Sequence, residues 1–214
     1  MISPLKWIAG TMLCVASALS PLAALAQVST TVSPAAPDTR SEDDAFLLLR
    51  DAARKDDAEK ADFYAGRLTN YQIPSYVDYY RLKPRIKQLT EAQFRDYLNR
   101  YKGSAIADRF RNDWLLELGR KRDWVVFDEQ YPQFALDDDT QLKCYALMSR
   151  AAKGQNVAPE ARNLLVSPPG YGEACGSLIA VLAQNGQFDT NELWAQIRLA
   201  GQTNATGPAR RIAL

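Results

Sequence analysis

From Ser41 onward the sequence repeats one pattern, in which short runs with apolar residues at helical spacing are separated by capping or turn residues. Alternation typical of strands is almost missing. The pattern predicts a chain of short helices, whose starts are marked by N-capping side chains or by prolines suited to a first helical turn. We expect ten helices, which begin after Ser41, at Ala58, at Pro74, after Thr90, after Ser104, after Asp123, at Thr140, at Pro159, at Glu173 and at Thr190. A further segment starts at Thr206 or Gly207.

Short helices joined by short turns favour an all-α fold of helical hairpins packed in sequence order, as in an α-solenoid or superhelix. A closed bundle is the alternative, but bundles generally use fewer and longer helices. The tetratricopeptide repeat does not fit, because Trp114 and Gly119 stand at the wrong spacing and no self-similarity of that period follows. We therefore expect an irregular α-solenoid.

Residues 1–26 have the organisation of a secretory signal peptide. Lys6 precedes an apolar run from Trp7 to Leu19, and the small residues Ala24 and Ala26 predict cleavage before Gln27. A membrane anchor is the alternative, but a span needs about 20 apolar residues and a proline closes this run earlier. The chain is therefore expected to be exported to the periplasm, with no stable membrane span after cleavage.

Two further features belong to this N-terminal part of the chain. Cys14 does not fit the lipidated cysteine of a lipoprotein signal, because the large residue Leu13 precedes it where a small one is needed. Residues 27–41 are small, polar and proline-bearing, which predicts a flexible linker between the signal peptide and the first helix.

Cleavage of the signal would leave two cysteines, Cys144 and Cys175. An even number of cysteines in an exported chain suggests a disulfide, here closing a loop of about 30 residues and contributing on the order of 3 kcal/mol. Two buried free thiols are the alternative. A catalytic cysteine is disfavoured, since the chain has no histidine to activate it.

Charge and histidine content narrow the classes of function. The sequence has 26 Lys plus Arg and 25 Asp plus Glu, and residues 1–26 carry only Lys6, so their removal leaves 25 charges of each sign. A neutral chain lacks the basic footprint of a nucleic-acid-binding or anionic-membrane-binding protein. The complete lack of histidine excludes Ser-His, Cys-His and His-metal sites within this chain.

The remaining candidates for chemistry are weak. Facing carboxylates could cleave a glycosidic bond, but each candidate lies on an ordinary charged helix face or at a cap. The Asp137-Asp138-Asp139 run lacks the spacing of a calcium loop and fits a solvated turn before a helix. Gly170-Tyr171-Gly172 lacks the pattern of a phosphate loop. The carboxylates considered for glycosidic cleavage are Glu117, Asp123, Glu129 and Glu192. We assign no catalytic, cofactor-binding or metal-binding residue.

Three tyrosines, Tyr76, Tyr79 and Tyr80, cluster on the third expected helix. Their ring faces could line a carbohydrate groove by stacking on sugars. The alternative is that they form part of the core between helices, where aromatic clusters are common.

Five stretches, in order along the chain, resemble the helical N-terminal region of soluble lytic murein transglycosylases. The resemblance covers about residues 42–214. The stretches are the Tyr71–Leu82 run with its tyrosines, the Arg109–Trp124 run that ends in an Asp-Trp pair, the Thr140–Tyr145 run with Cys144, the Glu173–Leu178 run with Cys175, and the Trp194–Ala200 run with Arg198, followed by Asn204–Gly207.

The resemblance implies a superhelical, U-type domain over residues 42–214, with a cysteine pair bridged as in that family. It also implies a separate C-terminal catalytic domain that cleaves peptidoglycan between N-acetylmuramic acid and N-acetylglucosamine. The Glu-Ser, Gly-Leu-Met-Gln and Ala-Tyr-Asn stretches that mark that domain do not occur in this sequence. We therefore expect a superhelical region truncated at its C-terminus, from which no catalytic residue can be carried over.

Two functions follow as expectations. The first is a periplasmic, non-catalytic region of a lytic transglycosylase that binds peptidoglycan glycan strands during cell-wall turnover. The second is a periplasmic α-solenoid adaptor that binds an envelope protein partner through its concave face.

Overall fold

The computed structural model describes residues 41–166, 172–202, 207 and 210, all of which belong to one compact unit, Thr39–Leu214. The expected signal peptide (1–26) and all of the expected linker (27–41) except Ser41 lie outside the described residues. Most of the segment expected after Thr206 lies outside them as well.

The described residues form ten α-helices and two short 3₁₀ helices, without a strand, so the all-α prediction is confirmed. The elements are α1 (Glu42–Arg54), α2 (Ala58–Ala65), α3 (Pro74–Leu82), η1 (Lys83–Gln88), α4 (Glu91–Arg100), α5 (Ala105–Lys121), α6 (Trp124–Gln130), η2 (Tyr131–Gln133), α7 (Thr140–Ala152), α8 (Ala158–Leu165), α9 (Glu173–Gln184) and α10 (Thr190–Gln202).

Capping side chains explain where the helices begin. The Ser41 hydroxyl accepts a hydrogen bond from the Asp44 backbone N–H at 3.1 Å, and the Ser104 hydroxyl caps α5 in the same way. Thr90 and Gln93 form the reciprocal capping box predicted for α4. Each cap satisfies backbone donors that have no partner in the first turn of a helix.

Some helix ends differ from the prediction, and a proline and a left-handed backbone conformation mark two of the ends. The second helix, expected to reach Leu68, ends at Ala65. After α3 the chain tightens into η1 at Pro84, because proline has no N–H to donate to the α-helical ladder. At the end of α5, Arg122 adopts a left-handed conformation (φ 61°) and turns the chain into α6.

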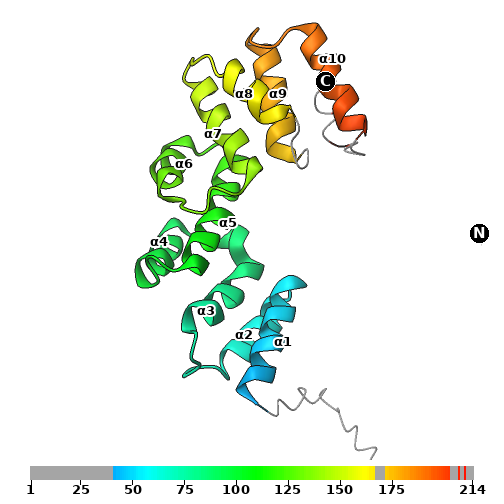
Figure 1. Cartoon of the computed structure of the whole chain (residues 1–214). Coiled ribbons are helices and arrows are strands. Elements are labelled where there is room, and N and C mark those ends of the chain that lie inside the picture. The colour runs from blue at the N-terminus through cyan, green and yellow to red at the C-terminus, as the bar shows by residue number, and fades with distance from the viewer. Residues whose placement is uncertain (1–40, 167–171, 203–206, 208–209, 211–214) are drawn as a thin grey trace, which may run out of the picture. The chain divides into compact units, whose positions relative to one another are not determined.

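The helices pack against neighbours along the chain (Figure 1). The pairs with the most extensive contacts are adjacent helices or helices separated by one other, such as α1 with α2, α5 with α7, and α7 with α9. This order agrees with hairpins packed in sequence order. The finer solenoid geometry stays a prediction.

Two apolar clusters form the core. The smaller lies between α1, α2 and α3, and the larger extends from α3 to α10. Tyr80 on α3 packs against both clusters and so links them. In the larger cluster Gly119 of α5 lies directly against the Tyr145 ring of α7, where a side chain on residue 119 would not fit.

The two cysteines lie in the larger cluster, and both are fully buried. Cys144 on α7 and Cys175 on α9 have their sulfur atoms at bonding distance, 2.01 Å, with Cα atoms 5.0 Å apart. Neither side chain is exposed. The pair joins α7 and α9, and the two cysteines are separated by 31 positions in sequence.

Among the helices that the structure describes, none combines the length and the apolar character that crossing a bilayer would need.

Candidate functional site

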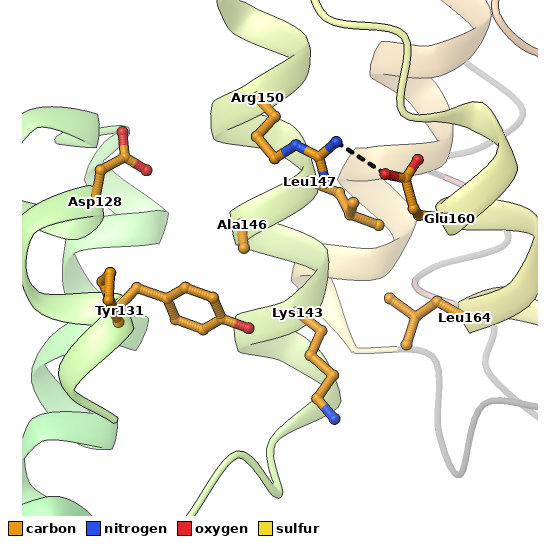
Figure 2. Close-up of a pocket in the computed structure, with 9 residues that line it drawn as sticks. Asp128, Tyr131, Lys143, Ala146, Leu147, Arg150, Glu160 and Leu164 are labelled. Atoms are coloured by element: carbon orange, nitrogen blue, oxygen red, sulfur yellow. Dashed lines mark hydrogen bonds and ion pairs between the residues drawn. The ribbon is translucent and has the colours of Figure 1, made fainter. Parts of the chain in front are cut away.

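A groove between α6, η2, α7 and α8 is the candidate site, and we call it the Tyr131 groove (Figure 2). Its volume is about 400 Å³, within the range of sites that hold small ligands. Apolar side chains form much of its wall, and charged side chains surround them. The lining residues are Asp128, Tyr131, Pro132, Lys143, Ala146, Leu147, Arg150, Glu160 and Leu164.

Tyr131 supplies the aromatic surface of the groove. Its ring stacks on Phe127 of α6, with centroids 5.4 Å apart and planes inclined by 14°. Figure 2 shows the ring extending from η2 toward α7. Burial raises the pKa of Tyr131, and the charges of Asp137 and Asp139 raise it further, so the phenol is protonated at neutral pH. Among the residues that the structure describes, none is a hydrogen-bond partner of this hydroxyl.

Asp128 is held firmly at one side of the groove. The Ser149 hydroxyl donates one hydrogen bond that the two carboxylate oxygens share, at 2.8 and 2.9 Å, and Lys153 donates to the same carboxylate. Ser149 is fully buried on α7. Asp128 is therefore positioned as an acceptor, with its orientation set by a buried donor.

An ion pair crosses the groove from α7 to α8. The Arg150 Nη2 lies 2.8 Å from Glu160 Oε1, as drawn in Figure 2, and Arg150 Nε also donates to Gln155 at 2.9 Å. The hydrogen bond from Arg150 lowers the pKa of Glu160. Glu160 is therefore ionised at neutral pH and suits accepting hydrogen bonds, not donating a proton as a general acid.

The arrangement can bind a ligand that is polar at its edges and apolar on one face. Ala146, Leu147 and Leu164 provide apolar contact beside the Tyr131 ring. The charged side chains around them can donate or accept hydrogen bonds. In the part of the chain that the structure describes, no three His, Cys, Asp or Glu side chains gather where they could hold a metal ion.

The four carboxylates considered from the sequence each have a structural role. Glu117 is buried and accepts a hydrogen bond from Arg120, while Asp123 caps α6. Glu129 binds Arg95 through both of its oxygens, at 2.7 and 2.8 Å. Glu192 accepts from Arg162 at 2.5 Å and caps the start of α10 through the Asp189 N–H at 2.9 Å.

The acidic run and the glycine loop also have structural roles. Asp137 pairs with Lys143 at 3.3 Å, Asp138 pairs with Arg109 at 3.0 Å, and Asp139 caps α7. The three carboxylates therefore serve three different partners. Gly170 and Tyr171 lie outside the described residues. At Gly172, a Cβ atom would approach the end of the Gln141 side chain to 2.0 Å, so a larger residue there would displace that side chain.

The three tyrosines of α3 do not share one exposed face. Tyr79 is 5% exposed, its ring meets Phe110 edge to face at 6.2 Å, and its hydroxyl donates to Asp113 at 3.0 Å. Tyr79 is therefore not available to stack on a sugar, and the core alternative applies to it. Tyr76 and Tyr80 are partly buried, with ring centroids 6.5 Å apart.

The Tyr131 groove is not predicted by the sequence, although part of its pattern is present there. Lys143, Ala146, Leu147 and Arg150 follow the spacing of one helix face, and Pro132 directly after Tyr131 indicates a helix end. The pairing of this face with α8 depends on long-range packing, which local spacing does not reveal.

Comparison with known proteins gave no matching family model and no matching curated protein. The resemblance to lytic transglycosylases therefore stays a prediction that rests on the five stretches of sequence.

Proposed function

We propose that this chain is an exported, non-catalytic helical domain that binds the glycan strands of peptidoglycan, and that it does so in the Tyr131 groove. The observation that carries the proposal is the Tyr131 ring, which lies beside an apolar wall and whose hydroxyl has no hydrogen-bond partner among the described residues. A sugar ring presents a less polar face of C–H groups and an edge of hydroxyls, which match these two surfaces.

The charged side chains around the groove support the same ligand. Asp128 and Glu160 supply acceptor oxygens, and Arg150 and Lys143 supply donors, so hydroxyl and acetamido groups would find partners of both kinds. Charges of both signs surround the groove, which suits a glycan better than a polyanion such as nucleic acid. The net charge of zero expected after signal cleavage agrees with this choice.

The resemblance to lytic transglycosylases supplies the biological setting. It implies a helical region that holds the wall polymer while a separate domain cleaves it. The marks of that catalytic domain do not occur in this sequence, and the carboxylates of the groove are engaged with Ser149, Lys153 and Arg150. The proposal is therefore binding without bond cleavage.

Co-sedimentation with purified peptidoglycan sacculi tests the proposal. We expect the chain from Gln27 onward to sediment with sacculi and to release no anhydromuropeptide. Ala146→Met, which extends a side chain into the groove, should weaken binding about tenfold, because a ligand would lose the space beside Tyr131.

Ala92→Met on the exposed face of α4 is the matched control and should bind like the parent. Equal binding of both variants would show that the Tyr131 groove does not hold the glycan. If sacculi do not bind at all but one envelope protein co-purifies in a fixed ratio, the adaptor function replaces glycan binding. Release of anhydromuropeptides would contradict the non-catalytic assignment.

A further inference from the structure

A second cavity lies apart from the residues that line the Tyr131 groove, and we call it the Arg111 pocket. It is bounded by the loop between α4 and α5, the first turns of α5, and the segment 133–136, and its volume is about 520 Å³. Small side chains leave the space open. The lining residues are Leu98, Lys102, Gly103, Ser104, Ala105, Ala107, Asp108, Arg111, Gln133, Ala135 and Leu136.

Arg111 carries a positive charge that the protein compensates only in part. Its side chain is 13% exposed, and its Nη1 donates to the amide oxygen of Gln130, which is neutral. The Nε is buried without a hydrogen-bond partner, and the nearest carboxylate oxygen, Oδ1 of Asp108, lies 3.8 Å away. A buried cation without a hydrogen-bonded carboxylate is unfavourable and attracts an anion.

Asp108 cannot move closer to Arg111 without losing other contacts. Its two oxygens accept hydrogen bonds from the backbone N–H groups of Ala135 at 3.1 Å and Leu136 at 2.7 Å. These bonds hold the segment 133–136 against α5 and so keep the pocket open. The Asp108 carboxylate is therefore engaged in shaping the cavity.

The pKa of Arg111 reflects this environment. Burial lowers the pKa of Arg111, and Asp108 offsets only part of the effect. Hydrogen bonds to a carboxylate raise the pKa values of Arg95, Arg120 and Arg162 instead. Arg111 thus differs from arginines that are hydrogen-bonded to a carboxylate.

A second cation lies at the same pocket. Lys102 is exposed, and no described carboxylate pairs with it. Against the single carboxylate of Asp108, the two cations leave the lining with one net positive charge. Apart from Gln133, its other walls are small or apolar, with Gly103, Ala105 and Ala107 among the small residues and Leu136 among the apolar ones.

We propose that the Arg111 pocket binds the C-terminal carboxylate of a short peptide whose last residues have small apolar side chains. The carboxylate lies toward Arg111 and Lys102, and the small side chains contact the alanine and leucine walls. Such a carboxylate can come from a peptide of the cell wall, which ends in D-alanine, or from the tail of a protein, which consists of L-residues. The inference goes beyond the glycan groove, because its ligand contains no sugar.

Calorimetric titration with N-acetyl-alanyl-alanine, and with the same compound as its C-terminal amide, tests the inference. We expect the acid to bind and the amide to bind at least about tenfold more weakly, because only the acid supplies a carboxylate that can pair with the charge of Arg111. Both the L,L and the D,D acid are titrated. A preference for the D,D acid points to wall peptides, and a preference for the L,L acid points to protein tails.

Variants of Arg111 test whether the acid binds in this pocket. Arg111→Gln should lose about tenfold or more in affinity for the acid, and Arg111→Lys should keep part of it. Arg109→Gln on the same helix is the control, since Arg109 pairs with Asp138 and does not line the pocket. Equal affinity for acid and amide in the parent chain, no binding of any acid, or parent-like binding by Arg111→Gln would each overturn the inference. The comparison of acid with amide uses the parent chain alone and does not depend on the folding of a variant.

Discussion

Cys144→Ser is expected to lower the free energy of unfolding by about 3 kcal/mol under oxidising conditions. Cys144 and Cys175 are both buried, and their sulfur atoms lie at bonding distance between α7 and α9. A covalent link across 31 positions restricts the unfolded chain, and that restriction is lost in the variant. Chemical denaturation followed by circular dichroism measures the difference.

Reductant provides the control for this prediction. With the bond reduced, the parent should fall close to the variant, and Cys144→Ser combined with Cys175→Ser should lose little more than either single change. Equal stability of parent and variant without reductant would mean that the cysteines contribute as two buried thiols.

Gly119→Ala is expected to destabilise the chain by about 1–3 kcal/mol, although alanine is the better helix former. A Cβ atom on residue 119 would lie 2.3 to 2.8 Å from atoms of the Tyr145 ring, far inside van der Waals contact. Tyr145 is buried between α5 and α7, so its ring has little room to move. Thermal or urea unfolding measures the loss.

Gly201→Ala on α10 is the matched change, because nothing lies within 4 Å of a Cβ atom there. It should stabilise by up to about 1 kcal/mol through helix propensity alone. In a Tyr145→Leu background the cost of Gly119→Ala should shrink, since the clashing ring is gone. If Gly119→Ala and Gly201→Ala had effects of the same sign, the close packing of α5 on α7 would be incorrect.

Local features of the fold could be predicted from sequence because they depend on neighbouring residues. Ser41, Ser104 and the Thr90–Gln93 capping box mark helix starts through bonds that span only three residues. The helix periodicity identified the all-α class for the same reason.

The candidate sites could not be predicted from the local spacing of residues. Tyr79 and Tyr80 are adjacent, but Tyr79 is in the core and Tyr80 is partly buried, because α5 covers one side of α3. The Arg150–Glu160 pair joins two helices. The incomplete pairing of Arg111 depends on where the segment 133–136 folds back onto α5. These are consequences of tertiary packing.

The most direct test of the central claim is an NMR titration of the isotopically labelled chain, from Gln27 onward, with soluble glycan fragments of peptidoglycan. We expect the backbone shift changes to cluster on the walls of the Tyr131 groove, from Asp128 to Tyr131 and from Lys143 to Arg150, and to extend to Glu160. In the Ala146→Met variant the same changes should require about tenfold more ligand. Shift changes centred instead on Tyr76 and Tyr80, or none at ligand concentrations that saturate sacculus binding, would contradict the proposal that this groove holds the glycan.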